Sequence, residues 1–373
     1  MRLLDRYLFR ELFAPLAFCL VGIQAFVTFF TSFNELGEMQ ERKLHLWDSV
    51  AYSILSATSY LTIVLPVSLL VALLIALANH ARSNEITAMR AAGVGLWRIC
   101  APYFVVGLLA GAALFALNEF LVPISTDWSW QIKTRYVHKA DDPDQQKDFR
   151  NFGFNNAREN RTWVIGEYRV TTSEMINPIV IWNLPDGSGR RLTADSAIRT
   201  NGGWTFFNVA EYSQADTNAQ LVPSLQTNEL AMPDFDETPS QIKSEIKISR
   251  YLSLGGAREA DIPLKDIFDY LRLHPSLSRA DSARLFTKFY GRLAAPWTCL
   301  VVVLIAIPFG AASGRRNLFF GVAGSIFICF TFFVIQQFSL GFGSEGYLPA
   351  WLAAWLPNMI FGAAGLILTA RVR

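Results

Sequence analysis

Long apolar runs alternate with short polar segments at both ends of the chain, and a long, more polar stretch separates the two groups. A helix that crosses the hydrocarbon core of a membrane needs about 20 consecutive apolar residues. Six runs reach or approach this length: 13–33, 50–78, 99–122, 293–312, 318–340 and 350–370. The pattern predicts a membrane protein with three spans before the polar stretch and three after it.

The polar stretch has a different period. From about residue 149 to 213, apolar and polar residues alternate every second position, and breakers such as Pro185-Asp186-Gly187 separate the runs, as in antiparallel strands joined by hairpins. The prolines between 213 and 249 favour short strands and loops. The aromatic residues fit either a buried β core, the commoner case, or a ligand surface: Trp163, Trp182, Trp204, Phe206 and Phe207.

Two helices are expected between the β region and the fourth span. Residues 263–271 predict an amphipathic helix whose apolar stripe is formed by Leu264, Ile267, Phe268 and Leu271. A second helix, capped by Ser278 or Asp281, is expected to continue straight into the fourth span. Together they predict a stiff connection to the membrane.

Basic residues indicate the orientation, because cytoplasmic loops are enriched in Lys and Arg. Arginines occur in the N-terminal segment, the second loop, the fourth loop and the C-terminal segment, whereas the fifth loop, 341–349, has Glu345 and no base. This distribution predicts six spans with both termini in the cytoplasm and the long middle stretch outside.

Composition excludes several kinds of chemistry. The net charge of +2 with 52% hydrophobic residues gives no indication of a nucleic-acid partner. The four cysteines lie within or at the edge of the apolar runs and show no spacing typical of disulfides or metal sites: Cys19, Cys100, Cys299 and Cys329. The chain contains no phosphate-binding loop, nucleophile elbow, zincin or Rossmann motif, so we expect no enzyme activity.

Ion-coupled transport also lacks the residues it needs. Ionisable groups inside membrane spans are costly and usually functional, yet the apolar runs contain almost none, since Glu11 and Glu119 lie near span ends. Energy for transport would then come from a separate ATPase.

The second loop, 80–98, predicts a short cytoplasmic helix. Ser83 or Asn84 can cap it, Glu85 complements its positive end, and Gly93 ends it. The residues alone allow two interpretations, a helix gripped by a cytosolic partner or a surface helix that stabilises a turn.

The second loop and the segments around it resemble a known protein family. The run 65–70 and above all the block 83–94 (Ser-Asn-Glu-Ile-Thr-Ala-Met-Arg-Ala-Ala-Gly-Val) are similar to the signature of the LptF/LptG (YjgP/YjgQ) permeases of the lipopolysaccharide-export ABC transporter. The opening Leu4-Asp5-Arg6-Tyr7 and the connector 264–290 also resemble the family and lean towards LptG. The resemblance covers essentially the whole chain.

The resemblance implies a domain plan. A membrane all-α domain of six helices (3+3 spans) would contain an inserted periplasmic β-jellyroll-like domain. The expected parts are spans 1–3 in 1–122, with a coupling helix at 83–93; the β domain and its linkers in 123–262; the connector helices in 263–292; and spans 4–6 in 293–373.

The resemblance also assigns the second-loop helix to contact with the ATPase. Glu85 is expected to make a polar or charged contact there, completed by Ile86, Met89 and Arg90. The full expected coupling set is Asn84, Glu85, Ile86, Thr87, Ala88, Met89, Arg90, Ala91 and Gly93.

In the family, the first and fifth spans of opposite subunits form lateral gates around a lipid cavity. The corresponding set here is Phe26, Phe30, Thr31, Phe33, Phe327, Phe330, Phe333, Gln336 and Gln337. Ordinary packing against lipid or other helices is the alternative for each aromatic residue. Thr31 stands where some members have a lysine, so head-group contact is assigned to Arg42 and Lys43 or to the sister subunit.

The implied partners are a cytosolic LptB-type ABC ATPase dimer, which would bind the ATP and magnesium, and a sister permease, LptF-type or, if this chain is the F subunit, LptG-type. An LptC-type single-span protein, a periplasmic bridge and lipopolysaccharide complete the set, with no cofactor in this chain. The implied location is the inner membrane of a Gram-negative bacterium. The alternative function is a membrane-anchored receptor or assembly scaffold that binds through its β domain.

Overall fold

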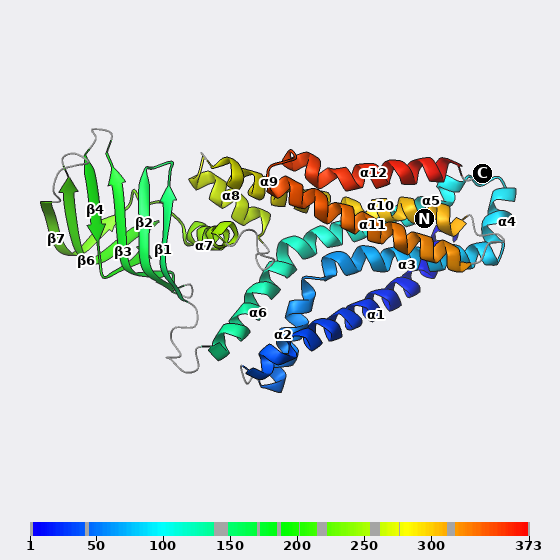
Figure 1. Cartoon of the computed structure of the whole chain (residues 1–373), viewed down its shortest axis with the longest axis horizontal. Helices are drawn as coiled ribbons and strands as arrows, with labels where there is room; N and C mark the ends of the chain where they lie inside the picture. The colour runs from blue at the N-terminus through cyan, green and yellow to red at the C-terminus, as the bar shows by residue number, and fades with distance from the viewer. Residues whose placement is uncertain are drawn as a thin grey trace. The chain divides into compact units, whose positions relative to one another are not determined.

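A computed structural model describes residues 3–41, 45–137, 148–169, 172–184, 188–200, 202–214, 222–253, 262–275, 277–311 and 318–371. The chain forms two compact units (Figure 1). The first, here the membrane unit, comprises Met1–Trp130 and Arg279–Arg373, and the second, the β unit, comprises Gln131–Ser278.

The described secondary structure of the membrane unit consists of helices joined by short turns. Its elements are α1 (Leu3–Glu41), α2 (Leu46–Thr58), α3 (Leu61–Arg82), α4 (Glu85–Ala91), α5 (Leu96–Ala116), a π-helical turn (Leu117–Leu121), α9 (Arg279–Ala294), α10 (Trp297–Ala311), α11 (Leu318–Ser344) and α12 (Ala350–Arg371). A further helix, α6 (Val122–Val137), continues from the π turn and crosses the boundary between the units.

Within the described residues, five helices are long and apolar enough to cross a membrane, and a sixth span results if the bent pair α9 and α10 counts as one. The predicted membrane class with an inserted β domain is confirmed. Two predicted spans differ in detail. The second is interrupted at Ser59 and Tyr60, so that α2 and α3 are separate helices.

The fourth span is bent by 51° between α9 and α10, so the prediction of a helix that runs straight into the membrane was wrong. Pro296 lies at the break. Proline has no backbone N–H, and its ring clashes with the carbonyl of the preceding turn. The connection therefore changes direction where it was expected to be stiff.

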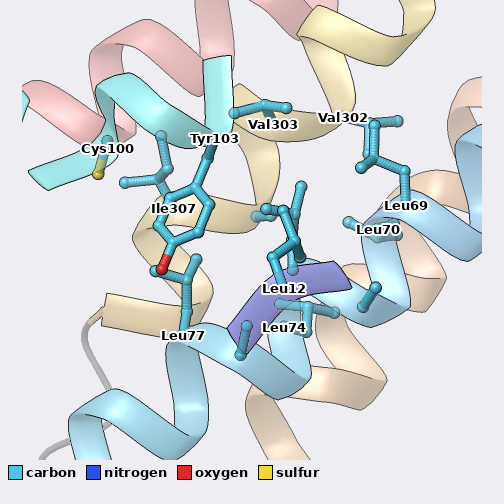
Figure 2. Close-up of a cluster of buried hydrophobic side chains, with 14 of the residues drawn as sticks. Leu12, Leu69, Leu70, Leu74, Leu77, Cys100, Tyr103, Val302, Val303 and Ile307 are labelled. Carbon is cyan, nitrogen blue, oxygen red and sulfur yellow. The ribbon is translucent and has the colours of Figure 1, made fainter. Parts of the chain in front are cut away.

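Helices α3 and α10 form the centre of the membrane unit. Helix α10 packs against α3, α5, α11 and α12, and α3 packs against α1. The shared core contains Tyr103 of α5 among aliphatic side chains of α1, α3 and α10, as Figure 2 shows: Leu12, Leu69, Leu70, Leu74, Leu77, Val302, Val303 and Ile307. In contrast, most of α1 beyond this contact is exposed.

The β unit contains one antiparallel sheet. Its strands are β1 (Asp148–Asn156), β2 (Arg161–Arg169), β3 (Glu174–Asn183), β4 (Gly189–Thr193), β5 (Ser196–Thr200), β6 (Gly203–Gln214) and β7 (Val222–Met232). Strands β4 and β5 both lie between β3 and β6, and each of them pairs with both of these strands. The antiparallel β domain is confirmed, and the family's jellyroll stays a prediction.

One face of the sheet is buried. Trp163, Trp204 and Phe206 are fully buried on it, and Phe235 packs against them. These aromatic residues are therefore core and not a ligand surface. Trp182 is partly buried against Phe235.

A helix completes the core in a segment for which the sequence predicted strands and loops, so this prediction was wrong. Helix α7 (Pro239–Ser253) contributes Ile242 and Ile246 to the core. A capping box begins it, since the Thr238 N–H donates to Gln241 Oε1 and the Gln241 N–H donates to Thr238 Oγ1. The proline at the first helical position favours a helix start instead of a strand.

Helix α8 (Leu264–Leu273) lies where an amphipathic helix was expected, but its buried face differs. The buried residues are Ile267, Tyr270 and Leu273, whereas Phe268 is exposed. The predicted stripe omitted Tyr270 and Leu273 because the contact with α7 is visible only in the folded chain.

Candidate functional site

Helix α4 connects α3 and α5 at one end of the membrane unit, and its backbone explains both of its ends. Asn84 adopts a left-handed conformation with φ 58° and makes no side-chain capping bond, so the expected cap by Asn84 is wrong. The helix ends at Gly93, whose φ of 82° favours glycine. There the Gly93 N–H donates to Arg90 O and the Val94 N–H donates to Met89 O, which satisfies carbonyls at the helix end.

Glu85 is bound within the chain. The Tyr7 hydroxyl of α1 lies 3.2 Å from both Glu85 carboxylate oxygens. His80 Nδ1 of α3 lies 2.7 Å from Glu85 Oε2, and the rings of Tyr7 and His80 are 5.7 Å apart between centroids. The carboxylate therefore connects α4 to two membrane helices.

A second polar contact lies at the start of α5. Arg98 Nη2 is 3.0 Å from Asp5 Oδ2 and 2.9 Å from Asp5 Oδ1. Asp5 and Tyr7 are both in the first turns of α1, so this helix end contacts the loop helix and the span that follows it.

The exposed face of α4 is narrower than expected. Ile86 is only 6% exposed and belongs to the membrane-unit core, and Met89 packs partly against that core. The expected contact face of Glu85, Ile86, Met89 and Arg90 is thus corrected, because Ile86 points inward. The exposed residues of the helix are Thr87, Ala88, Arg90 and Ala91.

The expected gate residues of α1 form an exposed aromatic stripe. Phe26, Phe30 and Phe33 are all more than half exposed. The Phe26 and Phe30 rings stack with centroids 6.4 Å apart. Thr31 does not share this face, since it is 8% exposed and its hydroxyl donates to Val27 O of its own helix.

Helix α11 carries a second exposed stripe. Phe327 and Phe330 are exposed, while Phe333 packs partly against the core and meets Phe332 edge to face. Gln336 is half-buried and Gln337 is exposed. The two candidates for head-group contact, Arg42 and Lys43, lie outside the described residues.

The sequence alone did not predict four residues of this site: Asp5, Tyr7, His80 and Arg98. His80 and Glu85 are five positions apart at the end of an apolar run, which is a weak local indication. Tyr7 and Glu85 are 78 positions apart, and no local pattern connects them. Only the packing of α1 on α3 brings them together.

The chain was compared with known proteins. Residues 6–371 match the family described as lipopolysaccharide export system permease LptF/LptG. No curated protein matches the chain. The match does not distinguish LptF from LptG. Because it spans nearly the whole chain, from α1 through the β unit to α12, this chain belongs to the LptF/LptG family of lipopolysaccharide export permeases.

Proposed function

We propose that this chain is the permease half of an ATP-driven machine that extracts lipopolysaccharide from the inner membrane. A separate LptB-type ATPase dimer binds and hydrolyses ATP, and α4 is the element through which it acts. A sister permease of the same family completes the membrane cavity. The family membership over residues 6–371 supports this proposal most strongly.

The geometry of α4 fits a mechanical contact. The helix is short, and its exposed residues Thr87, Ala88, Arg90 and Ala91 are small or polar, so a groove in another protein can approach it closely. Its other side is fixed by Ile86 in the core and by Glu85 on α1 and α3. A displacement of α4 by a partner bound to its exposed face would therefore also move the membrane helices α1 and α3.

The aromatic stripes of α1 and α11 fit the lipid side of the same function. Exposed phenylalanines suit acyl chains, and each stripe belongs to a helix that the family uses as a lateral gate. We propose that α1 of one permease faces α11 of the other, so that Phe26 and Phe30 meet Phe327 and Phe330 across the opening. Gln336 and Gln337 extend the lining on α11.

Orientation and partners complete the proposal. Arg90 lies in α4, and Arg82 and Arg98 flank it; these basic residues favour the cytoplasm for this end. The β unit then lies in the periplasm. There an edge strand of its sheet offers unpaired backbone groups to an LptC-type protein or a periplasmic bridge.

The test is lipopolysaccharide release from vesicles that contain the complete complex of this chain, its sister permease and the ATPase. The wild-type complex is expected to release lipopolysaccharide only with hydrolysable ATP. Arg90→Glu on the exposed face of α4 is expected to reduce release at least tenfold. A partner surface that binds an arginine is acidic, and it would repel the negative charge of the glutamate. The matched control is Arg272→Glu on the exposed face of α8, which should leave release unchanged.

The alternative function, a receptor or scaffold, predicts a different result. A complex that binds lipopolysaccharide but releases none with ATP, and that contains no nucleotide-hydrolysing subunit, would support the alternative. Equal release by wild type and Arg90→Glu would exclude the assigned face of α4.

A further inference from the structure

The first two turns of α1 contact the coupling region at two places. Tyr7 reaches Glu85 at the start of α4, and Asp5 reaches Arg98 at the start of α5. The region between these contacts is the loop helix that the proposed function assigns to the ATPase. We call Asp5, Tyr7, His80, Glu85 and Arg98 the clasp.

The histidine of the clasp is protected from water, whereas its carboxylate and tyrosine are partly exposed. His80 is 3% exposed, whereas the Glu85 side chain is 35% exposed. A carboxylate only accepts hydrogen bonds, so His80 Nδ1 bears the proton of the 2.7 Å contact. Among the described residues, His80 Nε2 is buried without a hydrogen-bond partner. Glu85 is thus the group that fixes the orientation of the His80 ring.

Such contacts are strong for their size. A hydrogen bond to a charged group contributes more than a neutral one. If Glu85 lost its two hydrogen-bond donors, α4 would be held on the helix bundle by Ile86 and the partly buried Met89. Helix α4 has seven residues, and so short a helix has little stability of its own.

Helix α1 is the element through which the clasp can affect the proposed gate. It holds the exposed stripe of Phe26, Phe30 and Phe33, and it is continuous from Leu3 to Glu41. Pro15 lies inside α1 without ending it, so a displacement of the first turns reaches the aromatic stripe within a single helix.

We propose that the clasp transmits movement of α4 to α1, with Asp5, Tyr7 and His80 as positioning residues. Glu85 then has a role inside this chain, as the link between the ATPase-driven helix and the gate helix. This gives a role to the opening Leu4-Asp5-Arg6-Tyr7, which the sequence singled out without a function. The inference rests on the proposed function, because it needs an ATPase that moves α4.

The experiment measures lipopolysaccharide released per ATP hydrolysed by the complete complex in vesicles, together with the amount of ATPase that co-purifies. Tyr7→Phe removes only the hydroxyl, and His80→Leu removes the ring donor. Each is expected to lower the ratio about tenfold, the factor for one lost hydrogen bond to a charged group, with wild-type co-purification of the ATPase. His80→Gln, which keeps a side-chain donor, should restore part of the loss.

Two controls make the result specific. Tyr60→Phe removes a hydroxyl from an exposed tyrosine of the same unit and should leave the ratio unchanged. The double variant Tyr7→Phe with Glu85→Ala should be no worse than Glu85→Ala alone, because either change removes the hydrogen bond between Tyr7 and Glu85.

The inference is overturned if Tyr7→Phe and His80→Leu keep the wild-type ratio while Glu85→Ala loses it, since Glu85 would then act only by touching the ATPase. It is also overturned if the two variants fail only through loss of the assembled complex. Failure of the proposed function is a separate outcome, in which the wild-type complex itself shows no ATP-dependent release.

Discussion

The Glu237 carboxylate is fully buried in the β unit and contacts three side chains. Glu237 Oε1 accepts from Asn156 Nδ2 at 2.8 Å and from Trp163 Nε1 at 3.1 Å, and Arg161 Nε lies 3.3 Å away. The Glu237 carbonyl accepts from Trp204 Nε1. Buried polar groups are costly unless they are paired, so this network holds the segment before α7 against the aromatic core.

A second buried pair gives the β unit a pH dependence. His274 Nδ1 lies 3.1 Å from Glu245 Oε1 between α7 and α8. Burial alone would lower the pKa of His274, but the contact with the Glu245 carboxylate raises it by more, above its ordinary 6.5. Burial raises the pKa of Glu245 as well, and His274 offsets this only in part.

Both shifts act in the same direction. A histidine whose pKa is raised by folding stabilises the folded state fully below its unfolded pKa and loses this contribution as the pH rises through the folded pKa. A carboxyl group with a raised pKa also favours folding less as the pH rises. We therefore expect the unfolding temperature of the β unit to fall by a few degrees between about pH 6 and pH 9.

The measurement is thermal unfolding of the full chain in detergent, followed by tryptophan fluorescence, to which the buried Trp163 and Trp204 of the β unit contribute. His274→Gln should remove most of the pH dependence. Other charged groups also lie at the contact between α7 and α8: Lys247, Asp266 and Asp269. They are present in both proteins, so their contribution to the pH dependence drops out of the comparison. Equal slopes in the two proteins would contradict the assignment.

At the residue scale, the sequence predicted which segment matters but not what its side chains contact. Glu85 was correctly identified as a polar residue at the start of a helix, yet its partners come from α1 and α3. Ile86 and Thr31 were assigned to functional faces and are buried. A one-dimensional pattern shows the identity of a residue, whereas its direction depends on how neighbouring helices pack.

At the element scale, polar side chains satisfy carbonyls at three irregular points of the helices. Gln24 Nε2 donates to Ala57 O near the end of α2, Arg292 Nη1 donates to Asn118 O in the π turn, and Asn358 Nδ2 donates to Ala294 O at the end of α9. Helix ends leave carbonyls without intrahelical partners, and the lipid offers no replacement. These polar residues therefore serve helix geometry.

Helices α5 and α10 pack closely because two glycines of α5 face α10. A Cβ on Gly111 would lie 2.6 Å from Pro296 O, and one on Gly107 would lie 2.7 Å from Val303 Cγ2. Glycines four residues apart allow such approach in membrane helices. The motif here joins two helices of one chain.

Gly111→Ala is expected to destabilise the membrane unit by about 1–3 kcal/mol, the usual cost of overpacking, because the atom in the way is backbone. The matched control is Gly22→Ala on α1, where nothing lies within 4 Å of the added Cβ. Alanine favours helix over glycine, so the control should be neutral or stabilising. Thermal unfolding in detergent compares them, and equal midpoints would contradict the close contact.

Element prediction succeeded where one period extends over many residues, as in the apolar runs that became α1, α3, α11 and α12. It failed at α7, where prolines suggested loops although the Thr238 and Gln241 pair starts a helix. It also failed at the bend before α10, because a proline inside an apolar run breaks or tolerates a helix according to the surrounding packing.

At the scale of the whole molecule, length and composition already indicated two groups of spans around an inserted domain. Burial requirements enforce this outcome, because apolar runs of span length and a strand-forming stretch cannot share one core. The pairing of distant residues in the clasp had no comparable indication. The architecture was therefore predictable, and the contacts that give α4 its mechanical connection were not.

The most direct test of the central claim is photo-crosslinking from α4. A photoreactive residue replaces Ala88, which is exposed on α4, and the matched control replaces Gly22 in the exposed part of α1. We predict that position 88, but not position 22, forms an adduct with a nucleotide-hydrolysing subunit, and that nucleotide changes its yield. If the ATPase co-purifies but never crosslinks to position 88, or if that position is labelled from the periplasm, the role assigned to α4 is wrong.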